Sequence, residues 1–344
     1  MEWYDIRKRS DRLRAVSIVI GGRGIGKTYS ALSFLLDTGK PFLYLRNTDK
    51  QMSLCASAFG NPFKKVAQWF MKKEVPVTYT IHTGSYSIKP LMSEIENITV
   101  LQDLVKHPLL KEWKLQIVHH DSPDRRGVDV AMLYNPRFFR VLNVTNARVK
   151  VEGYDSFRTR DQMCVTGLMG GDKVSVIVNH WPSRSGGEET SRHLRAAAAH
   201  RVKLTVDSLL NDDPNQGIII MGDLNDDPQD KSCSMVLGAQ KKQEDVEEGY
   251  FFNPFWTMLD KGIGSYCYKG NWDLFDQIIV SHSLLSQGGS KLKYLKCEVF
   301  NKEFLKQQDG AYRGYPHRTF SGGVFLNGYS DHFPTQVFLI KEIK

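Results

Sequence analysis

Hydrophobic positions along the chain follow two different spacings, which indicates a mixture of strands and helices. Short apolar or alternating runs predict strands, and these runs cover residues 115–120, 128–134, 140–151, 174–179 and 218–221. Helices are predicted over residues 98–106, with Asn97 as the N-cap, and over residues 190–210, where Leu194, Val202 and Leu209 recur at helical spacing. The alternation of these elements is compatible with an α/β fold.

The run Ile218–Met221 leads directly into Gly222, Asp223, Leu224 and Asn225. Residues two apart on a strand point to the same face, so Asp223 and Asn225 are expected to project together. They would stand at the carboxyl end of the strand, where open α/β sheets build their sites. A Gly-Asp-x-Asn motif alone is a weak signal.

The motif gains weight from other acids and histidines along the chain. They are Glu94, His180, Asp276, Asp331 and His332. Carboxylate and amide oxygens select hard cations such as Mg²⁺, Mn²⁺ or Ca²⁺, and such a cation assists the hydrolysis of phosphate esters. The sequence holds no Cys-x-x-Cys, His-Glu-x-x-His or Gly-x-Ser-x-Gly motif, which leaves zinc-site and serine-hydrolase chemistry with little support.

In their order, these pieces resemble the endonuclease/exonuclease/phosphatase superfamily, the deoxyribonuclease I-like phosphoesterases. The resemblance runs from about Glu94 to the C-terminus. The matching segments are residues 94–97, 126–134, 179–183, 222–225, 275–279 and 330–332. The resemblance implies a two-sheet α/β/β/α sandwich and a phosphate-ester substrate, with phosphodiesters as the first choice and nucleic acid among the candidates.

The resemblance also implies a role for each residue. Glu94 and Asp331 would bind the metal, Mg²⁺ or Mn²⁺, while Asp223 and Asn225 would orient water and contact the phosphate. His332 would lie beside the phosphate. The remaining roles fall to Asp276, which would hold His332, to His180 near the leaving oxygen, and to Arg160 as a phosphate-side arginine. Each of these residues has an ordinary structural explanation when taken alone.

A different motif occupies the start of the chain. Residues 16–20 form a short apolar run that leads into a G-x-x-x-x-G-K-T sequence, the phosphate-cradling P-loop, with Gly21, Gly26, Lys27 and Thr28 as its candidate nucleotide-binding residues. A helix over 29–36 and a strand over 41–46 are predicted to follow. This β-α-β segment resembles the start of a phage-type DNA-packaging or terminase ATPase, with ATP as its ligand.

Two gaps qualify both resemblances. No apolar strand between residues 46 and 75 ends in the acid that an ATPase needs for Mg²⁺, so the expected segment is a partial P-loop over residues 1–75. The phosphoesterase domain, expected over residues 76–344, lacks the family's opening strand with its asparagine. The alternatives are therefore an ATP-binding DNA-packaging module, whose nucleotide binding would depend on Lys27, and a fusion whose phosphoesterase domain is inactive.

Charge and cysteine content narrow the setting. Residues 1–75 hold 14 Lys and Arg against 6 Asp and Glu, and the rest of the chain holds 32 of each. The net charge of +8 therefore says little about the substrate of the later part. Five scattered cysteines argue against a disulfide framework. We expect a cytoplasmic monomer without a membrane span or signal peptide, although relatives of the phosphoesterase part are often exported.

The histidine pair and one loop arginine receive structural interpretations. His119 and His120 are adjacent on a predicted strand, so they face opposite sides, and both are expected to be structural. Arg184 lies in a Ser- and Gly-rich loop after His180 and is expected to be solvated. The long loop before the last strand, around residues 312–323, is of the kind that carries specificity.

Overall fold

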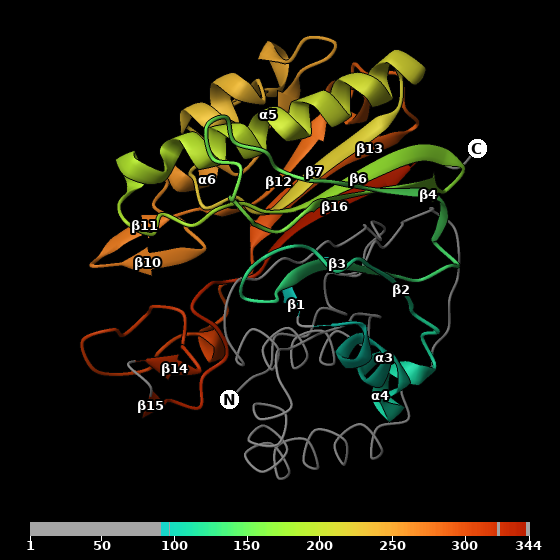
Figure 1. Ribbon diagram of the computed structural model, residues 1–344. Coiled ribbons are helices and arrows are strands. Elements are labelled where there is room, and N and C mark those ends of the chain that lie inside the picture. Colours follow the sequence, from blue (N-terminus) through green and yellow to red (C-terminus); the bar gives the residue numbers. More distant parts are fainter. Residues whose placement is uncertain (1–90, 96, 322–323, 342–344) are drawn as a thin grey trace.

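The computed structural model describes residues 91–95, 97–321 and 324–341 (Figure 1). The predicted P-loop with Gly21, Gly26, Lys27 and Thr28 lies outside the described residues, as does the predicted boundary near residue 75. These two expectations stay predictions.

A seven-stranded sheet forms the centre of the described structure. Its strand order is β4-β5-β6-β7-β12-β9-β8. The strands are β4 (Phe139–Ala147), β5 (Gln162–Met169), β6 (Asp172–His180), β7 (Gly217–Asp223), β12 (Asp276–Ser281), β9 (Phe251–Phe252) and β8 (Ala239–Gln240). The neighbours β6 and β7 are parallel because a helical crossover joins them, whereas β12 runs antiparallel to β7.

The helix α5 (Glu188–Asp212) is this crossover, and it lies along one face of the sheet (Figure 1). Its Ala198, Ala199 and Val202 pack in one buried cluster with Ile218 and Ile220 of β7. Small alanine side chains allow the helix to approach the branched side chains of the strand closely. The π-helical turn η2 (Ser232–Val236) joins the same layer.

Strands from three other parts of the chain cover the opposite face. A three-stranded sheet has the order β1-β3-β2, and a two-stranded sheet pairs β13 with β16. Their bounds are β1 (Leu91–Ile95), β2 (Gln116–His119), β3 (Asp129–Tyr134), β13 (Leu292–Val299) and β16 (Thr335–Lys341). Val130 and Met132 of β3 and Leu339 of β16 share one buried cluster with Ile219 and Met221 of β7. The middle strands β5, β6, β7 and β12 are therefore buried on both faces, whereas β4 is largely exposed.

Shorter elements surround these layers. The helices are α3 (Ile98–Lys106), α4 (Pro108–Lys111) and α6 (Trp256–Leu259), with 3-10 turns at Gln243–Asp245 (η3), His282–Leu284 (η4) and Glu303–Leu305 (η5). Two small hairpins pair β10 (Tyr266–Tyr268) with β11 (Asn271–Asp273) and β14 (Phe320–Ser321) with β15 (Val324–Phe325). None of the helices in the described part combines the length and the apolar character that crossing a bilayer requires.

Several predicted elements are confirmed, and others needed correction. The helix over 98–106 is present with its Asn97 cap, whose Oδ1 accepts the N–H of Thr99 at 2.9 Å. The predicted strand over 140–151 is too long, since β4 ends at Ala147. Strand β5 was not predicted because its Gly167 interrupts the β pattern. The structure gives that glycine a reason: a Cβ there would lie 2.5 Å from the Phe139 ring.

Candidate functional site

Three polar side chains stand side by side at one edge of the central sheet. In the strand register, Asp223 at the end of β7 pairs with His180 at the end of β6 and with Asp276 at the start of β12. Residues in register on neighbouring strands share a face. The same face of β7 carries Ile219 and Met221, which pack against the sheets β1-β3-β2 and β13-β16. All three side chains are buried, and His180 Nε2 lies 3.6 Å from Asp223 Oδ2.

A glycine and a tight turn hold Asp223 in place. Gly222 has φ +143°, and a Cβ there would lie 1.8 Å from the carbonyl oxygen of Asn179, so no other residue fits this close approach of β6 and β7. Beyond the strand, Asn225 takes the left-handed conformation with φ 51°. Its backbone N–H donates to Asp223 Oδ1 at 3.0 Å, and its side-chain amide donates to the Trp181 carbonyl at 2.9 Å.

His332 reaches this edge from the last loop of the chain. Its Nδ1 lies 2.6 Å from Asp276 Oδ2, and its backbone N–H donates to Ser330 Oγ at 3.0 Å. The Tyr266 ring packs against the imidazole with a centroid distance of 4.8 Å. A backbone bridge between Tyr266 and His332 fixes the same contact. The imidazole is therefore held by a carboxylate on one side and an aromatic ring on another.

The resulting group brings together ligand atoms that suit a divalent cation. One ligand atom each from Asp223, Asp276 and His332 lies within 4.8 Å of the others. Asp276 Oδ1 is buried and has no hydrogen-bond partner among the described residues. The two carboxylates suit Mg²⁺ or Mn²⁺, whereas an imidazole ligand favours zinc, copper, iron or nickel. The residues present thus fit a divalent cation at or beside this group.

The two predicted metal ligands have a different standing. Glu94 lies on β1 at a bulge between Ser93 and Ile95, in a strand that lies against β6 and β7, and its side chain is outside the described part. Asp331 is half-buried and directly precedes His332. Asp331 does not belong to the described group of clustered ligand atoms. Their metal-binding roles stay predictions.

Arg160 lies behind the site with its guanidinium engaged by the protein. Nε donates to the His180 carbonyl at 3.0 Å, Nη2 to the Trp181 carbonyl at 2.6 Å, and Nη1 to Asp124 Oδ2 at 3.0 Å. These bonds hold the end of β6 and, through Asp124, the loop after β2. These contacts favour a role for Arg160 in positioning His180, rather than the predicted contact with phosphate.

His119 and His120 face opposite sides, as alternation along a strand requires. His119 Nε2 lies 3.1 Å from Asp129 Oδ2, while Ser122 donates its N–H and its hydroxyl to Asp129 Oδ1 at 2.7 and 2.6 Å. His119, Asp129 and Asp121 also satisfy the spacing of a metal group. Because protein donors already occupy both oxygens of Asp129, we interpret this group as a structural contact that holds the loop after β2 in place.

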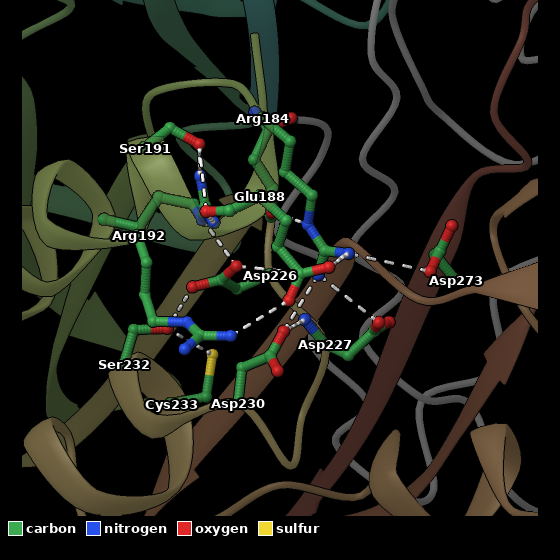
Figure 2. Close-up of polar contacts among 12 residues, drawn as sticks. Arg184, Glu188, Ser191, Arg192, Asp226, Asp227, Asp230, Ser232, Cys233 and Asp273 are labelled. Atoms are coloured by element: carbon green, nitrogen blue, oxygen red, sulfur yellow. Dashed lines mark hydrogen bonds and ion pairs between the residues drawn. The ribbon is translucent and has the colours of Figure 1, made fainter. Parts of the chain in front are cut away.

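The expectation for Arg184 was wrong, because carboxylates surround it. Its side chain is 21% exposed. Its Nε donates to the Asn225 carbonyl at 2.9 Å and its Nη2 to Asp230 Oδ2 at 2.8 Å. Figure 2 shows Glu188, Asp226, Asp227, Asp230 and Asp273 around the guanidinium. The signal available in the sequence was the acidic stretch of residues 226–230, which needs a cation once it is buried.

Burial raises the pKa of Asp227, one of the acids around Arg184. Asp227 is buried, and the loss of solvation, aided by the nearby charge of Asp273, raises its pKa to about 7. The Leu274 N–H and Arg184 act in the opposite direction but do not cancel this effect. Asp273 also has a raised pKa, chiefly because of burial, and it shares a side-chain hydrogen bond with Asp227. A proton held by Asp227 therefore bridges the two carboxyl groups.

A sequence model of the Endonuclease/Exonuclease/phosphatase family matches residues 77–341 of the chain. The chain therefore belongs to this family, and its class is that of the phosphoesterases. No curated protein matches the chain.

Solved structures agree with the mixed α/β fold of this family. The human Nocturnin catalytic domain with bound sulfate is similar at 11% identity and a TM-score of 0.51, over 96% of this chain and 95% of that one. The mannosyl-6-phosphatase of Bacteroides thetaiotaomicron is similar at 15% identity and a TM-score of 0.51, over 94% and 99%. Truncated TDP2 of Caenorhabditis elegans has 14% identity and a TM-score of 0.49, over 95% and 97%. At such identities the likeness to Nocturnin and to the mannosyl-6-phosphatase concerns the fold alone.

Proposed function

We propose that this protein is a divalent-metal-dependent hydrolase of phosphodiesters. One observation carries the proposal: Asp223, Asp276 and His332, which are far apart in the sequence, bring their ligand atoms within 4.8 Å of one another beside His180. Buried acids and imidazoles at the end of a sheet suit the handling of a phosphate and a proton. We also propose that the sheets of β1-β3-β2 and β13-β16 act as one layer, which would give the family's two-sheet sandwich.

The metal in this proposal is Mg²⁺ or Mn²⁺. Glu94 and Asp331 are its proposed ligands, and Asp331 directly precedes His332, which belongs to the group of Asp223, Asp276 and His332. A bound cation of this kind supplies charge neutralisation for the phosphate in the transition state.

The protein's own residues would divide the remaining work. Asp276, bonded to Nδ1 of His332, keeps the proton on that nitrogen, so the other ring nitrogen is the one that takes or gives a proton. Asp223 would orient the attacking water. Asn225 would bind the phosphate and His180 the leaving oxygen.

Turnover of a substrate panel tests the proposal. The panel contains a phosphodiester, a phosphomonoester, single-stranded DNA and an inositol phosphate, each with Mg²⁺ and with Mn²⁺. The variants are His332→Ala and Asp223→Ala, and the control is His200→Ala, a histidine exposed on α5. We expect the first two to lower phosphodiester turnover by about 10³-fold or more and the control to leave it unchanged.

The outcomes separate the alternatives. Equal turnover by wild type, His332→Ala and Asp223→Ala would contradict the assignment of the site. Hydrolysis of the phosphomonoester alone would move the substrate class from diesters to monoesters. No turnover of any compound by wild type would support an inactive phosphoesterase domain.

A further inference from the structure

Arg318 is held beside the candidate site by its neighbours in the last loop. The His317 carbonyl accepts the N–H groups of Tyr329 at 2.5 Å and Ser330 at 3.0 Å. On the other side, the buried Thr319 hydroxyl lies 3.3 Å from the Gly328 carbonyl. These bonds fix the backbone at residue 318 against the segment that continues into Asp331 and His332.

The Arg318 side chain lies over a ring that contacts the candidate site. Its guanidinium carbon is 5.8 Å from the centroid of the Tyr266 ring, and that ring is 4.8 Å from the His332 ring. Tyr266 also stacks on Phe275 at 5.5 Å, which fixes the orientation of its ring. Arg318 therefore stands one aromatic ring away from His332.

No carboxylate of the described residues pairs with this guanidinium. Other arginines near the site each have an acid: Arg160 binds Asp124, Arg184 binds Asp230, and Arg195 binds Asp226. Arg318 is half-buried, and in the described part of the structure its side chain contacts the Tyr266 ring. A cation–ring contact of this kind leaves the planar fork of N–H donors available for an anion.

We propose that Arg318 binds a second phosphate group of the substrate, adjacent to the phosphate that is hydrolysed. This inference rests on the proposed phosphodiesterase function. Because Arg318 and His332 both contact the Tyr266 ring, the guanidinium lies near the candidate site, where we place the neighbour of the reacting phosphate. The substrate class is thus a molecule that carries two phosphates, and Arg318 selects it over a molecule with one.

Two chromogenic substrates that differ by one phosphate test this inference. Thymidine 5′-(p-nitrophenyl phosphate) has only the scissile group, and its 3′-phosphorylated form adds the second. We expect wild type to have the higher kcat/KM for the second compound. Arg318→Gln should lower kcat/KM for that compound by about 10- to 100-fold and leave the first compound nearly unchanged. Arg318→Lys keeps the charge but lacks the planar fork of N–H donors. Its kcat/KM for the second compound should therefore lie between those of wild type and Arg318→Gln.

The matched control is Arg313→Gln, which removes an exposed arginine from the same loop. We expect it to leave both substrates unchanged. An equal loss for both substrates in Arg318→Gln would show a general structural role and overturn the inference. Equal kcat/KM of wild type for the two substrates would overturn it as well.

Calorimetric binding separates this inference from the proposed function. The probes are thymidine 3′,5′-bisphosphate and thymidine 5′-monophosphate, neither of which needs to be hydrolysed. We expect Arg318→Gln to lower the affinity for the bisphosphate by about 10-fold and to change the affinity for the monophosphate little. If wild type hydrolyses nothing but Arg318→Gln still shows this difference, the proposed function fails, while the binding of a second phosphate by Arg318 stands. If Arg318→Gln binds both probes as wild type does, the inference is overturned.

Discussion

His332 Nδ1 lies 2.6 Å from Asp276 Oδ2, although the two residues are 56 positions apart in the chain. Asp276 is the first residue of β12 and is fully buried, and His332 is 8% exposed. The contact is a consequence of topology. Strand β12 runs antiparallel to β7, so its first residue meets the end of β7, where the last loop also returns.

Asp276→Asn should separate the contribution of this contact from the fold. The amide keeps the shape of the side chain but no longer stabilises a protonated imidazole or fixes its tautomer. We expect kcat for the phosphodiester to fall by about 10²- to 10⁴-fold, with a small change in KM. Steady-state kinetics measure this, and a melting curve checks the fold. Asp260→Asn, an exposed acid, is the control, and an unchanged kcat in Asp276→Asn would remove Asp276 from the catalytic machinery.

Divalent metal dependence gives a second prediction. Treatment with EDTA should abolish phosphodiester turnover, and Mg²⁺ or Mn²⁺ should restore it. Metal should also raise Tm, because a ligand that binds only the folded state stabilises that state. Glu94→Gln and Asp331→Asn should raise the metal concentration needed for half-maximal activity by about 10-fold or more.

The same titration distinguishes two sets of ligands. One outcome is that Asp276→Asn shifts the metal requirement while Glu94→Gln and Asp331→Asn leave it unchanged. The cation is then held by the group of Asp223, Asp276 and His332. Full activity of wild type in EDTA would contradict metal dependence altogether.

Gly222 makes the site possible, and its replacement gives a third prediction. Gly222→Ala combines an unfavourable φ of +143° with a Cβ placed 1.8 Å from the Asn179 carbonyl. We expect the free energy of unfolding to fall by about 3 kcal/mol or more, measured by denaturant titration. Gly127→Ala is the control, since its φ is +66° and nothing lies within 4 Å of its Cβ. We expect about 1 kcal/mol there, and equal losses in both variants would mean that the crowding at Gly222 is relieved cheaply.

Local pattern was enough to predict part of this architecture. The strand ending at Asp223 and the helix over 98–106 follow from hydrophobic runs and a capping residue. The convergence of His180, Asp223 and Asp276 depends on which strands are neighbours, a relationship that the resemblance to a known family implied and local pattern did not.

Long-range electrostatic partners were out of reach of the sequence. Arg184 looked solvated because its own loop is rich in Ser and Gly, whereas its partner Asp230 lies 46 residues later. Arg160 is a similar case, since its partner Asp124 lies 36 residues earlier and its other contacts are backbone carbonyls. Pairings of this kind are set by how loops meet, and no periodicity records them.

Arg184 leads to a fourth prediction, since it acts through the turn that carries Asn225. Its Nε bonds the Asn225 carbonyl at 2.9 Å, and its guanidinium lies 4.6 Å over the Phe275 ring. Arg184→Lys keeps the charge but cannot bond the carbonyl and the acids together. We expect kcat to fall by about 10-fold with little change in Tm. Arg192→Lys, on the exposed side of α5, is the control, and a lower Tm at wild-type kcat would restrict Arg184 to a structural role.

Asp227 provides a pH-dependent prediction. Its pKa is raised to about 7 by burial, whereas an unfolded chain gives an aspartate its ordinary value of about 3.9. Between these values the unfolded state binds fewer protons than the folded state at this residue. The contribution of Asp227 to stability is therefore fully present below about pH 4 and is lost as the pH rises to about 7.

Asp227→Asn should remove this loss. The Asn oxygen can still accept the Leu274 N–H, which reaches Asp227 Oδ1 at 2.6 Å, and its amide can donate to Asp273 as the protonated acid does. Relative to wild type, we expect the free energy of unfolding of the variant to rise by on the order of 2 kcal/mol between pH 4 and pH 7. The Tm of the variant should rise relative to wild type over the same range. Thermal melts at pH 4, 5.5, 7 and 8 measure the difference. Asp260→Asn, which removes an exposed charge, should show no such trend, and a constant difference between Asp227→Asn and wild type across this range would mean that Asp227 is already ionised in the folded protein.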